Sequence, residues 1–222
     1  MGNRAVITTS RAIDPQNSTD IGVYLHWNGG RDSVEAFLKY CELKQYRTPE
    51  TDSYGWARLC QVISNYFGGS LSIGIDQCCK LDCDNGDNGT YIIRNWEIVG
   101  RKYEPSYEQD SYDITSMLLE IDKAQPVSEQ LGKEFLTAKE INTEDVKIGD
   151  MVFVPQYDGK WKKMEVLGFG TKVMNGFGLE NVPYVGFYGD EQRGYDWNIN
   201  NYIRTKTVKV AEQQYKINKG GN

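Results

Sequence analysis

The residues with the clearest chemical potential lie in the segment IGVYLHWNGGRD, residues 21–32. His26, the single histidine of the chain, is followed by Gly29, Gly30 and Arg31, which lead into a predicted helix. Unpaired N–H groups and the helix dipole at such a start attract anions. The segment lacks the longer glycine fingerprints of dinucleotide and P-loop sites. An anion site at these four residues is therefore one alternative, and a turn followed by a helix start is the interpretation that we favour.

Cysteine chemistry is a second alternative, because His26 could activate a cysteine nucleophile. The chain has five cysteines. Cys41 and Cys60 fall on apolar helical stripes, where cysteine usually behaves as a small buried hydrophobe. The other three cysteines lie close together in the sequence, but they lack a conventional zinc spacing and a fourth ligand. The sequence therefore favours structural cysteines over a Cys–His pair, and it predicts no zinc site.

The segment DQCCKLDCDNGDNGT, residues 76–90, is dense in aspartate, asparagine and glycine. Asp82, Asp84 and Asp87 could ligate a divalent cation, but the segment fails the EF-hand pattern, which needs a glycine at the sixth position and a glutamate at the twelfth. The repeated Asp-Asn-Gly is typical of turns that join two strands. We keep these three aspartates as weak metal candidates and predict that the protein needs no metal and no cofactor.

The elements that must position these residues can be predicted from hydrophobic periodicity. Val23, Leu25 and Trp27 alternate with polar residues, which predicts a strand with one buried face. Asp32 and Glu35 have the spacing of an N-cap and a capping box, and an apolar helical stripe follows to residue 41.

A second helix should begin after Asp52 and end at Gly68-Gly69, and a strand over residues 71–75 should follow. Two amphipathic helices between two strands bury their stripes best against one face of a sheet. We therefore predict an α+β fold for the N-terminal domain, with two or more helices packed on its sheet.

The charge of the chain is unevenly distributed, although the formal net charge is only −6. Residues 71–145 carry seven basic and sixteen acidic side chains, whereas residues 146–222 are mildly basic. This balance does not favour bulk nucleic-acid binding, which needs a concentrated basic face. The acidic middle is interpreted as a solvated helix face or as a docking surface for a basic partner, with these candidate residues: Glu120, Asp122, Glu129 and Glu134.

The C-terminal part reads VKIGDMVFVPQYDGKWKKMEVLGFG and resembles the start of SH3-like small barrels. We place the domain boundary after residue 140, with an α+β domain over residues 1–140 and a small SH3-like β-barrel over residues 141–222. The barrel has more aromatic residues than a small core needs. These either pack between the barrel and the N-terminal domain or form a recognition surface for a peptide or bases, with these candidates: Tyr157, Trp161, Lys162 and Lys163.

Three blocks, GNRAVI, YLHWNGGRDSVEAFLKYC and YGWARLCQVISNYFGG, resemble a family of phage and mobile-element proteins to which no activity is assigned. The resemblance covers most of residues 1–120 and transfers no catalytic residue. It implies a small bacterial, cytoplasmic protein that binds a host protein or nucleoprotein complex. One form of such a protein is an inhibitor of a defence nuclease, of the anti-CRISPR or anti-restriction type.

The sequence leaves two other functions open. One is an enzyme acting on nucleic acid or a nucleotide, which would use His26 or a metal at the aspartate-rich segment. The other is an RNA-binding accessory protein that works through the barrel. No apolar run reaches the length of a membrane span, and the first residues lack the apolar core of a signal peptide. Of these functions we favour the non-enzymatic binder, which needs no membrane.

Overall fold

The computed structural model describes residues 2–69, 72–103, 111–156, 160–174, 177–186, 203 and 205–211. The chain is mixed α+β and divides into two compact units, residues 1–132 and residues 133–222. The boundary lies before the one predicted at 140. Helix α4 (Lys133–Thr137) belongs to the second unit, because its Phe135 packs against aromatic side chains there.

The first unit is built on a five-stranded mixed sheet with the order β3-β2-β1-β4-β5. The central strand β1 (Ala5–Thr8) pairs antiparallel with β2 (Ile21–Leu25) and parallel with β4 (Thr90–Arg94). The outer strands β3 (Ile73–Gln77) and β5 (Glu97–Lys102) each pair antiparallel with their neighbour. The aspartate-rich segment 76–90 therefore connects two strands that are not neighbours, because β1 and β2 lie between β3 and β4.

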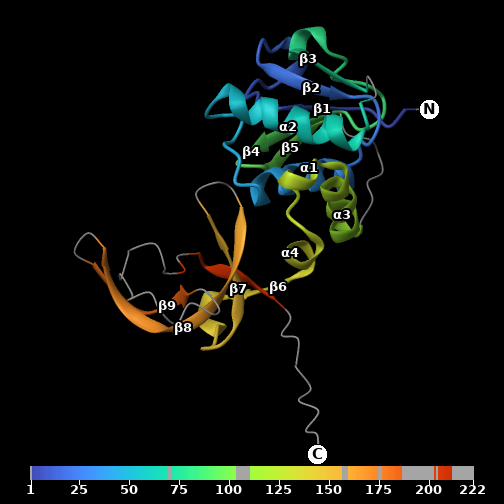
Figure 1. Cartoon of the computed structure of the whole chain (residues 1–222). Coiled ribbons are helices and arrows are strands. Elements are labelled where there is room, and N and C mark those ends of the chain that lie inside the picture. The colour runs from blue at the N-terminus through green and yellow to red at the C-terminus, as the bar shows by residue number, and fades with distance from the viewer. Residues whose placement is uncertain are drawn as a thin grey trace, which may run out of the picture. The chain divides into compact units, whose positions relative to one another are not determined.

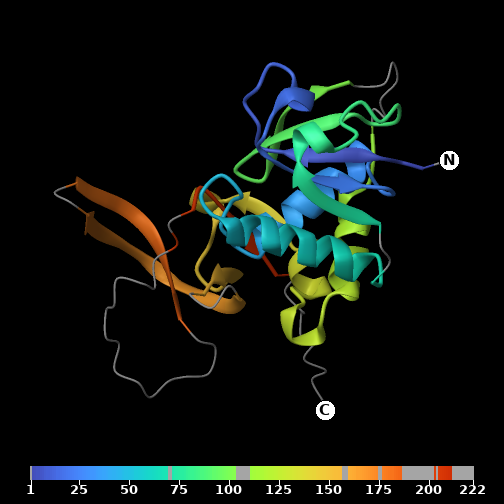
Figure 2. The same cartoon turned by 90° about the horizontal axis from the view of Figure 1, so that it is seen from above.

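Three helices pack together on one face of this sheet (Figures 1 and 2). They are α1 (Arg31–Leu43), α2 (Ser53–Tyr66) and α3 (Ile114–Ala124). The predicted order strand, helix, helix, strand is confirmed for β2, α1, α2 and β3. The predicted limits of α2 are confirmed as well, since Asp52 caps its start by accepting from the Tyr54 N–H.

Two predictions about the segment between β2 and α1 are wrong. The N-cap is Gly30, and Asp32 lies inside the first turn, so the capping box with Glu35 does not form. Strand β2 ends at Leu25, and Trp27 is 44% exposed instead of buried in the core. The chain turns away from the sheet after Leu25, so Trp27 does not face the core although it continues the alternating sequence pattern.

The opposite face of the sheet is covered by loops and two short 3-10 helices, η1 (Pro15–Asn17) and η2 (Cys78–Lys80). A small buried core forms there between β1 and the loops, and Val6, Cys78 and Cys83 are its buried members. Both faces of β1 are therefore buried, which explains why all four of its residues lack solvent exposure.

The second unit contains a five-stranded sheet with the order β6-β10-β7-β8-β9. Gly149, at φ +90°, makes the turn into β7, and β8 and β9 form a long curved hairpin (Figure 1). Among the described residues the outer strands β6 and β9 do not pair, so no closed barrel is formed there. The strands are β6 (Lys139–Asn142), β7 (Met151–Pro155), β8 (Trp161–Met174), β9 (Phe177–Gly186) and β10 (Thr207–Val210).

The core of the second unit lies on one face of its sheet and is made of aliphatic side chains. Val152, Met164, Val166 and Val208 are its main buried members. Two further 3-10 helices connect the elements around the boundary, η3 (Val127–Glu129) in the first unit and η4 (Thr143–Asp145) in the second.

Candidate functional site

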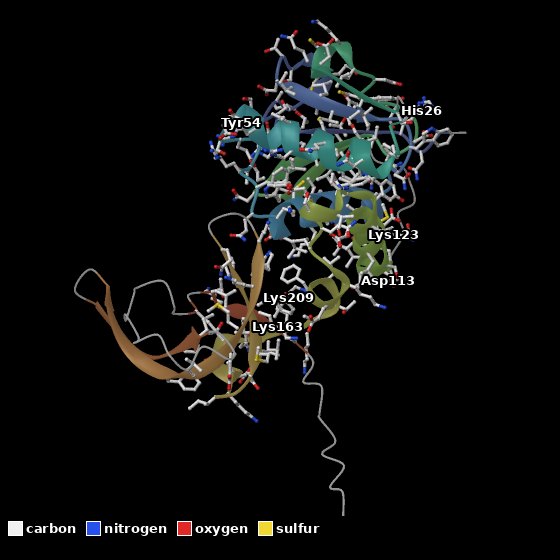
Figure 3. The ribbon with its side chains drawn as sticks, in the orientation of Figure 1. His26, Tyr54, Asp113, Lys123, Lys163 and Lys209 are labelled. Atoms are coloured by element: carbon white, nitrogen blue, oxygen red, sulfur yellow. The ribbon has the colours of Figure 1, made fainter. Side chains whose placement is uncertain are left out.

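An exposed group of aromatic side chains lies where β2 ends, and we call Tyr24, His26 and Trp27 the β2-exit cluster. His26 and Trp27 are exposed and Tyr24 is half-buried. The His26 and Trp27 rings meet edge to face with their centroids 4.9 Å apart. The Tyr24 hydroxyl lies 3.4 Å from Nδ1 of His26, and burial raises the Tyr24 pKa. Figure 3 shows His26 at the periphery of the first unit. These two contacts set the positions of the three rings relative to one another.

The N-terminal segment holds the backbone of this cluster in place. The Asn3 N–H donates to the His26 carbonyl (3.2 Å), and the Gly29 N–H donates to the Asn3 carbonyl (2.7 Å). A Cβ at Gly29 would lie only 2.6 Å from the Arg4 carbonyl carbon. Glycine is needed at this position because the two backbone segments approach so closely.

The alternative of an anion site at His26, Gly29, Gly30 and Arg31 gains no support from the contacts of these residues. The Gly29 N–H is already bonded within the protein. The Arg31 guanidinium pairs with the Glu35 carboxylate at 2.6 Å, and Asp32 adds a negative charge in the first turn of α1. A carboxylate at the positive end of the helix dipole provides the charge that an anionic ligand would bring.

The alternative of a Cys–His pair is not realised either, and the favoured interpretation of Cys41 and Cys60 as buried residues is confirmed. Cys41 and Cys60 are buried in α1 and α2. Burial raises the pKa of both thiols, that of Cys60 to about 11. The exposed Cys79 follows Cys78, which bonds to Asp20 at the start of β2, whereas His26 lies beyond its end. Because the whole length of β2 separates them, His26 cannot activate Cys79.

The three aspartates of the 76–90 segment do not converge on one point. Asp87 accepts from both the N–H and the Nε of Arg4, at 3.0 and 2.7 Å, and this hydrogen bonding lowers the Asp87 pKa. The Asp82 carboxylate lies 3.9 Å from the Arg4 guanidinium, measured from Oδ2 to Nη1, and Asp84 is exposed. Within the described residues, no group of three or more histidine, cysteine or acidic side chains could hold a metal ion. Arg4 supplies the positive charge that balances Asp87.

The acidic candidates have separate structural roles instead of forming one docking face. Asp122 is 5% exposed, so its assignment to an exposed surface was wrong. Glu129 pairs with the buried Lys44 at 3.3 Å. Glu134 forms an ion pair with Lys163. Glu120 is exposed on α3, and it is the one of the four whose described contacts leave it available to a partner.

The aromatic and basic candidates of the second unit are largely engaged within that unit. The Trp161 ring stacks on Phe135 of α4 with the centroids 4.7 Å apart. Lys163 is paired with Glu134 of the same helix, and the labelled Lys163 can be followed in Figure 3. Lys162 is exposed, and Tyr157 lies outside the described residues. The packing interpretation therefore accounts for Trp161 and Lys163.

A second surface feature lies at the C-terminal ends of α2 and α3. It is an open pocket of about 500 Å³, lined by residues that include Asn65, Gly68, Lys123 and Gln125. Gln125 is buried and bonded to Asn65 and to the Val62 carbonyl. The Asn65 and Gln125 side chains are therefore occupied by contacts that join the two helices.

The sequence interpretation missed Tyr24 and Trp27 as functional candidates. A usable signal was present, since Trp27 directly precedes Asn28-Gly29-Gly30, and a strand is expected to end before such a turn.

Comparison with known protein families, with curated proteins and with solved structures finds no match to this chain. In the described part of the chain, no helix combines the length and the apolar composition that crossing a membrane requires.

Proposed function

We propose that this protein is a non-enzymatic binding protein of phage or mobile-element origin, which engages a host protein or nucleoprotein complex in the bacterial cytoplasm. The observation that carries the proposal is the β2-exit cluster. Tryptophan and tyrosine are enriched among the residues that dominate binding energy at protein interfaces. Trp27 exposes 44% of its surface, and its neighbour His26 is exposed as well.

The position of the cluster in the fold supports this use. Strand β2 lies between β1 and β3 and is paired along its length on both sides. The contacts of Asn3 with His26 and Gly29 then fix the segment beyond the strand. Side chains that are held in place before binding lose less conformational entropy in the complex. The cluster can therefore anchor a partner without first being ordered.

The kind of partner follows from the charge and the aromatic character of the surface. The cluster combines apolar ring surface with the polar groups of His26 and Tyr24, and Tyr24 lies close enough to the Arg4–Asp87 ion pair to be influenced by its charges. Such a surface fits the mixed apolar and polar patch of another protein better than a phosphate backbone. Within this proposal, an inhibitor of a defence nuclease would bind the protein part of its target.

We also propose that the second unit is related to SH3-like small barrels and acts as a supporting module. The Gly149 turn, β7 and the β8–β9 hairpin support this assignment. Exposed Lys162 is the residue through which this unit would add affinity for a nucleoprotein target.

The test is a pull-down from host lysate with the tagged full-length chain, with and without nuclease, read by mass spectrometry. Trp27→Ala should reduce recovery of the partner at least tenfold, which corresponds to about 1.4 kcal/mol. Tyr54→Ala is the matched control, since Tyr54 is an exposed aromatic residue on α2 (Figure 3). Recovery of one stoichiometric protein that survives nuclease treatment supports the proposal.

Three results would contradict it. The first is an equal reduction of partner recovery by Trp27→Ala and Tyr54→Ala, which would show that the β2-exit cluster contributes no more to binding than another exposed aromatic residue. Only RNA or DNA could be recovered, which would favour the RNA-binding alternative. The pull-down could also be empty in a lysate that contains the host defence systems.

A further inference from the structure

Two of the buried cysteines form a pair on the loop-covered face of the first sheet. Cys78 opens η2 and Cys83 follows five residues later, and both have 0% exposure. They share a small core with Val6, and Leu81 and Tyr103 pack against it. Both side chains belong to this one buried cluster, and Sγ of Cys83 hydrogen bonds to the Cys78 carbonyl oxygen.

Several hydrogen bonds hold the turn that brings them together. The Leu81 N–H donates to the Cys78 carbonyl at 3.0 Å, and Sγ of Cys83 lies 3.5 Å from the same oxygen. Sγ of Cys78 lies 3.2 Å from Oγ1 of Thr8, and the Thr90 hydroxyl donates to the Cys83 carbonyl at 3.0 Å. The chain reverses tightly between the two cysteines, as a short disulfide-closed loop requires.

The two sulfur atoms have unequal acidity. Hydrogen bonding from Cys83 is the main cause that lowers the pKa of the Cys78 thiol to about 7, and the same contact raises the pKa of Cys83. The thiolate is the reactive form of cysteine. Cys78 therefore has the character of an attacking thiolate near neutral pH, and Cys83 has that of its resolving partner.

We propose that Cys78 and Cys83 are a redox-active dithiol that a peroxide oxidises to an intramolecular disulfide. The Cys78 thiolate attacks one oxygen of hydrogen peroxide, so an S–O bond forms, the O–O bond breaks and hydroxide leaves as water after taking up a proton. Cys83 then attacks this sulfenic acid, loses its proton and forms the S–S bond, while the S–O bond breaks and a second water leaves. The sulfurs are oxidised and the peroxide is reduced.

The pair lies just below the surface, because the adjacent Cys79 is exposed and Leu81 is only half-buried. Oxidation would lock the turn between the end of β3 and the aspartate-rich segment, which bonds to Arg4 through Asp87. The proposal rests on the two cysteines and not on the β2-exit cluster, although Tyr24 of that cluster packs against the same small core.

The chain offers a direct readout, since Lys80 separates the two cysteines. The reduced full-length protein is treated with hydrogen peroxide, blocked with N-ethylmaleimide while still folded, and digested with trypsin. A disulfide between Cys78 and Cys83 keeps the peptides of residues 59–80 and 81–94 joined until a reductant separates them. The intact chain should also become lighter by two hydrogen atoms, and three of its five cysteines should remain as thiols.

Variants assign the bond. Cys79→Ser should keep the joined peptides, and Cys83→Ser should abolish them. Cys41 and Cys60 are the internal controls, because they are buried thiols with raised pKa values and should stay unmodified. The proposal is overturned if peroxide leaves all five thiols reduced, or if Cys79→Ser abolishes the link. It is also overturned if Cys78 is oxidised only to sulfinic acid without joining Cys83. Because the wild-type link is itself the readout, a variant that fails to fold does not affect the test.

Discussion

The buried carboxylate of Asp122 is the strongest test of how the first unit is held together. It accepts hydrogen bonds from the Tyr40 hydroxyl at 2.7 Å, from the Leu131 N–H at 2.7 Å and from the Gly132 N–H at 3.0 Å. Tyr40 is 1% exposed. These contacts join α1 and α3 to the segment that ends the unit. A charged group can be buried at acceptable cost only when such donors replace its water.

Tyr40→Phe should therefore destabilise the first unit clearly. The substitution removes one hydrogen bond to a charged group, which contributes about 1.5–3 kcal/mol, and it leaves ring packing unchanged. With a urea slope of about 2 kcal/mol per molar, the unfolding midpoint should fall by about 1 M. Asp122→Ala should cost more, because it leaves the Tyr40 hydroxyl and two half-buried N–H groups without their acceptor.

The assay is a urea titration read by pulsed alkylation of Cys41 in the full-length chain. Cys41 has 0% exposure, and all five cysteines lie in residues 1–132, so the signal reports on the first unit. Tyr54→Phe is the matched control, since Tyr54 is 63% exposed, and its midpoint should not move. A Tyr40→Phe curve that superimposes on the wild-type curve would refute the assigned role of this contact.

Three further predictions follow from other contacts. Gly29→Ala should lower stability in thermal melts by about 1–3 kcal/mol, because the new Cβ would meet backbone atoms at 2.6–2.7 Å. Gly30→Ala is the control and should cost less, because its Cβ would closely approach only a side chain that can rotate. Equal losses of stability in the two variants would contradict this prediction. Phe135→Ala should cost about 3–5 kcal/mol and raise hydrogen exchange in β7, to which the ring packs; unchanged exchange would count against it. Arg4 lowers the Asp87 pKa, so this pair stabilises the fold above the pKa of an unfolded aspartate, about 3.9, and its contribution is lost as the pH falls through the lowered folded pKa. The difference in unfolding free energy between wild type and Arg4→Gln should therefore be present at pH 7 and shrink at pH 2. A difference that does not depend on pH would refute the pairing.

The sequence by itself determined the local elements of the first unit. Apolar spacing predicted α1, α2 and their flanking strands, because helical and strand periodicities differ and each pattern is long enough to be recognised. Asp52 and Gly68 marked the ends of α2 for reasons that act within one turn, a side-chain cap and a left-handed backbone. The turn at Gly149 was predictable on the same basis. These features depend only on neighbours in the chain.

The tertiary structure alone decided which polar residues were free to act. Asp122, Glu129 and Glu134 look alike in the sequence, yet one is buried among donors and two pair with lysines remote in the chain. The contact between Cys78 and Cys83 arises from a tight turn, and the exposure of Trp27 depends on where β2 leaves the sheet. Burial and pairing are set by residues that sequence spacing does not relate. The sequence could therefore indicate which chemistry was available, and only packing could assign it to a surface.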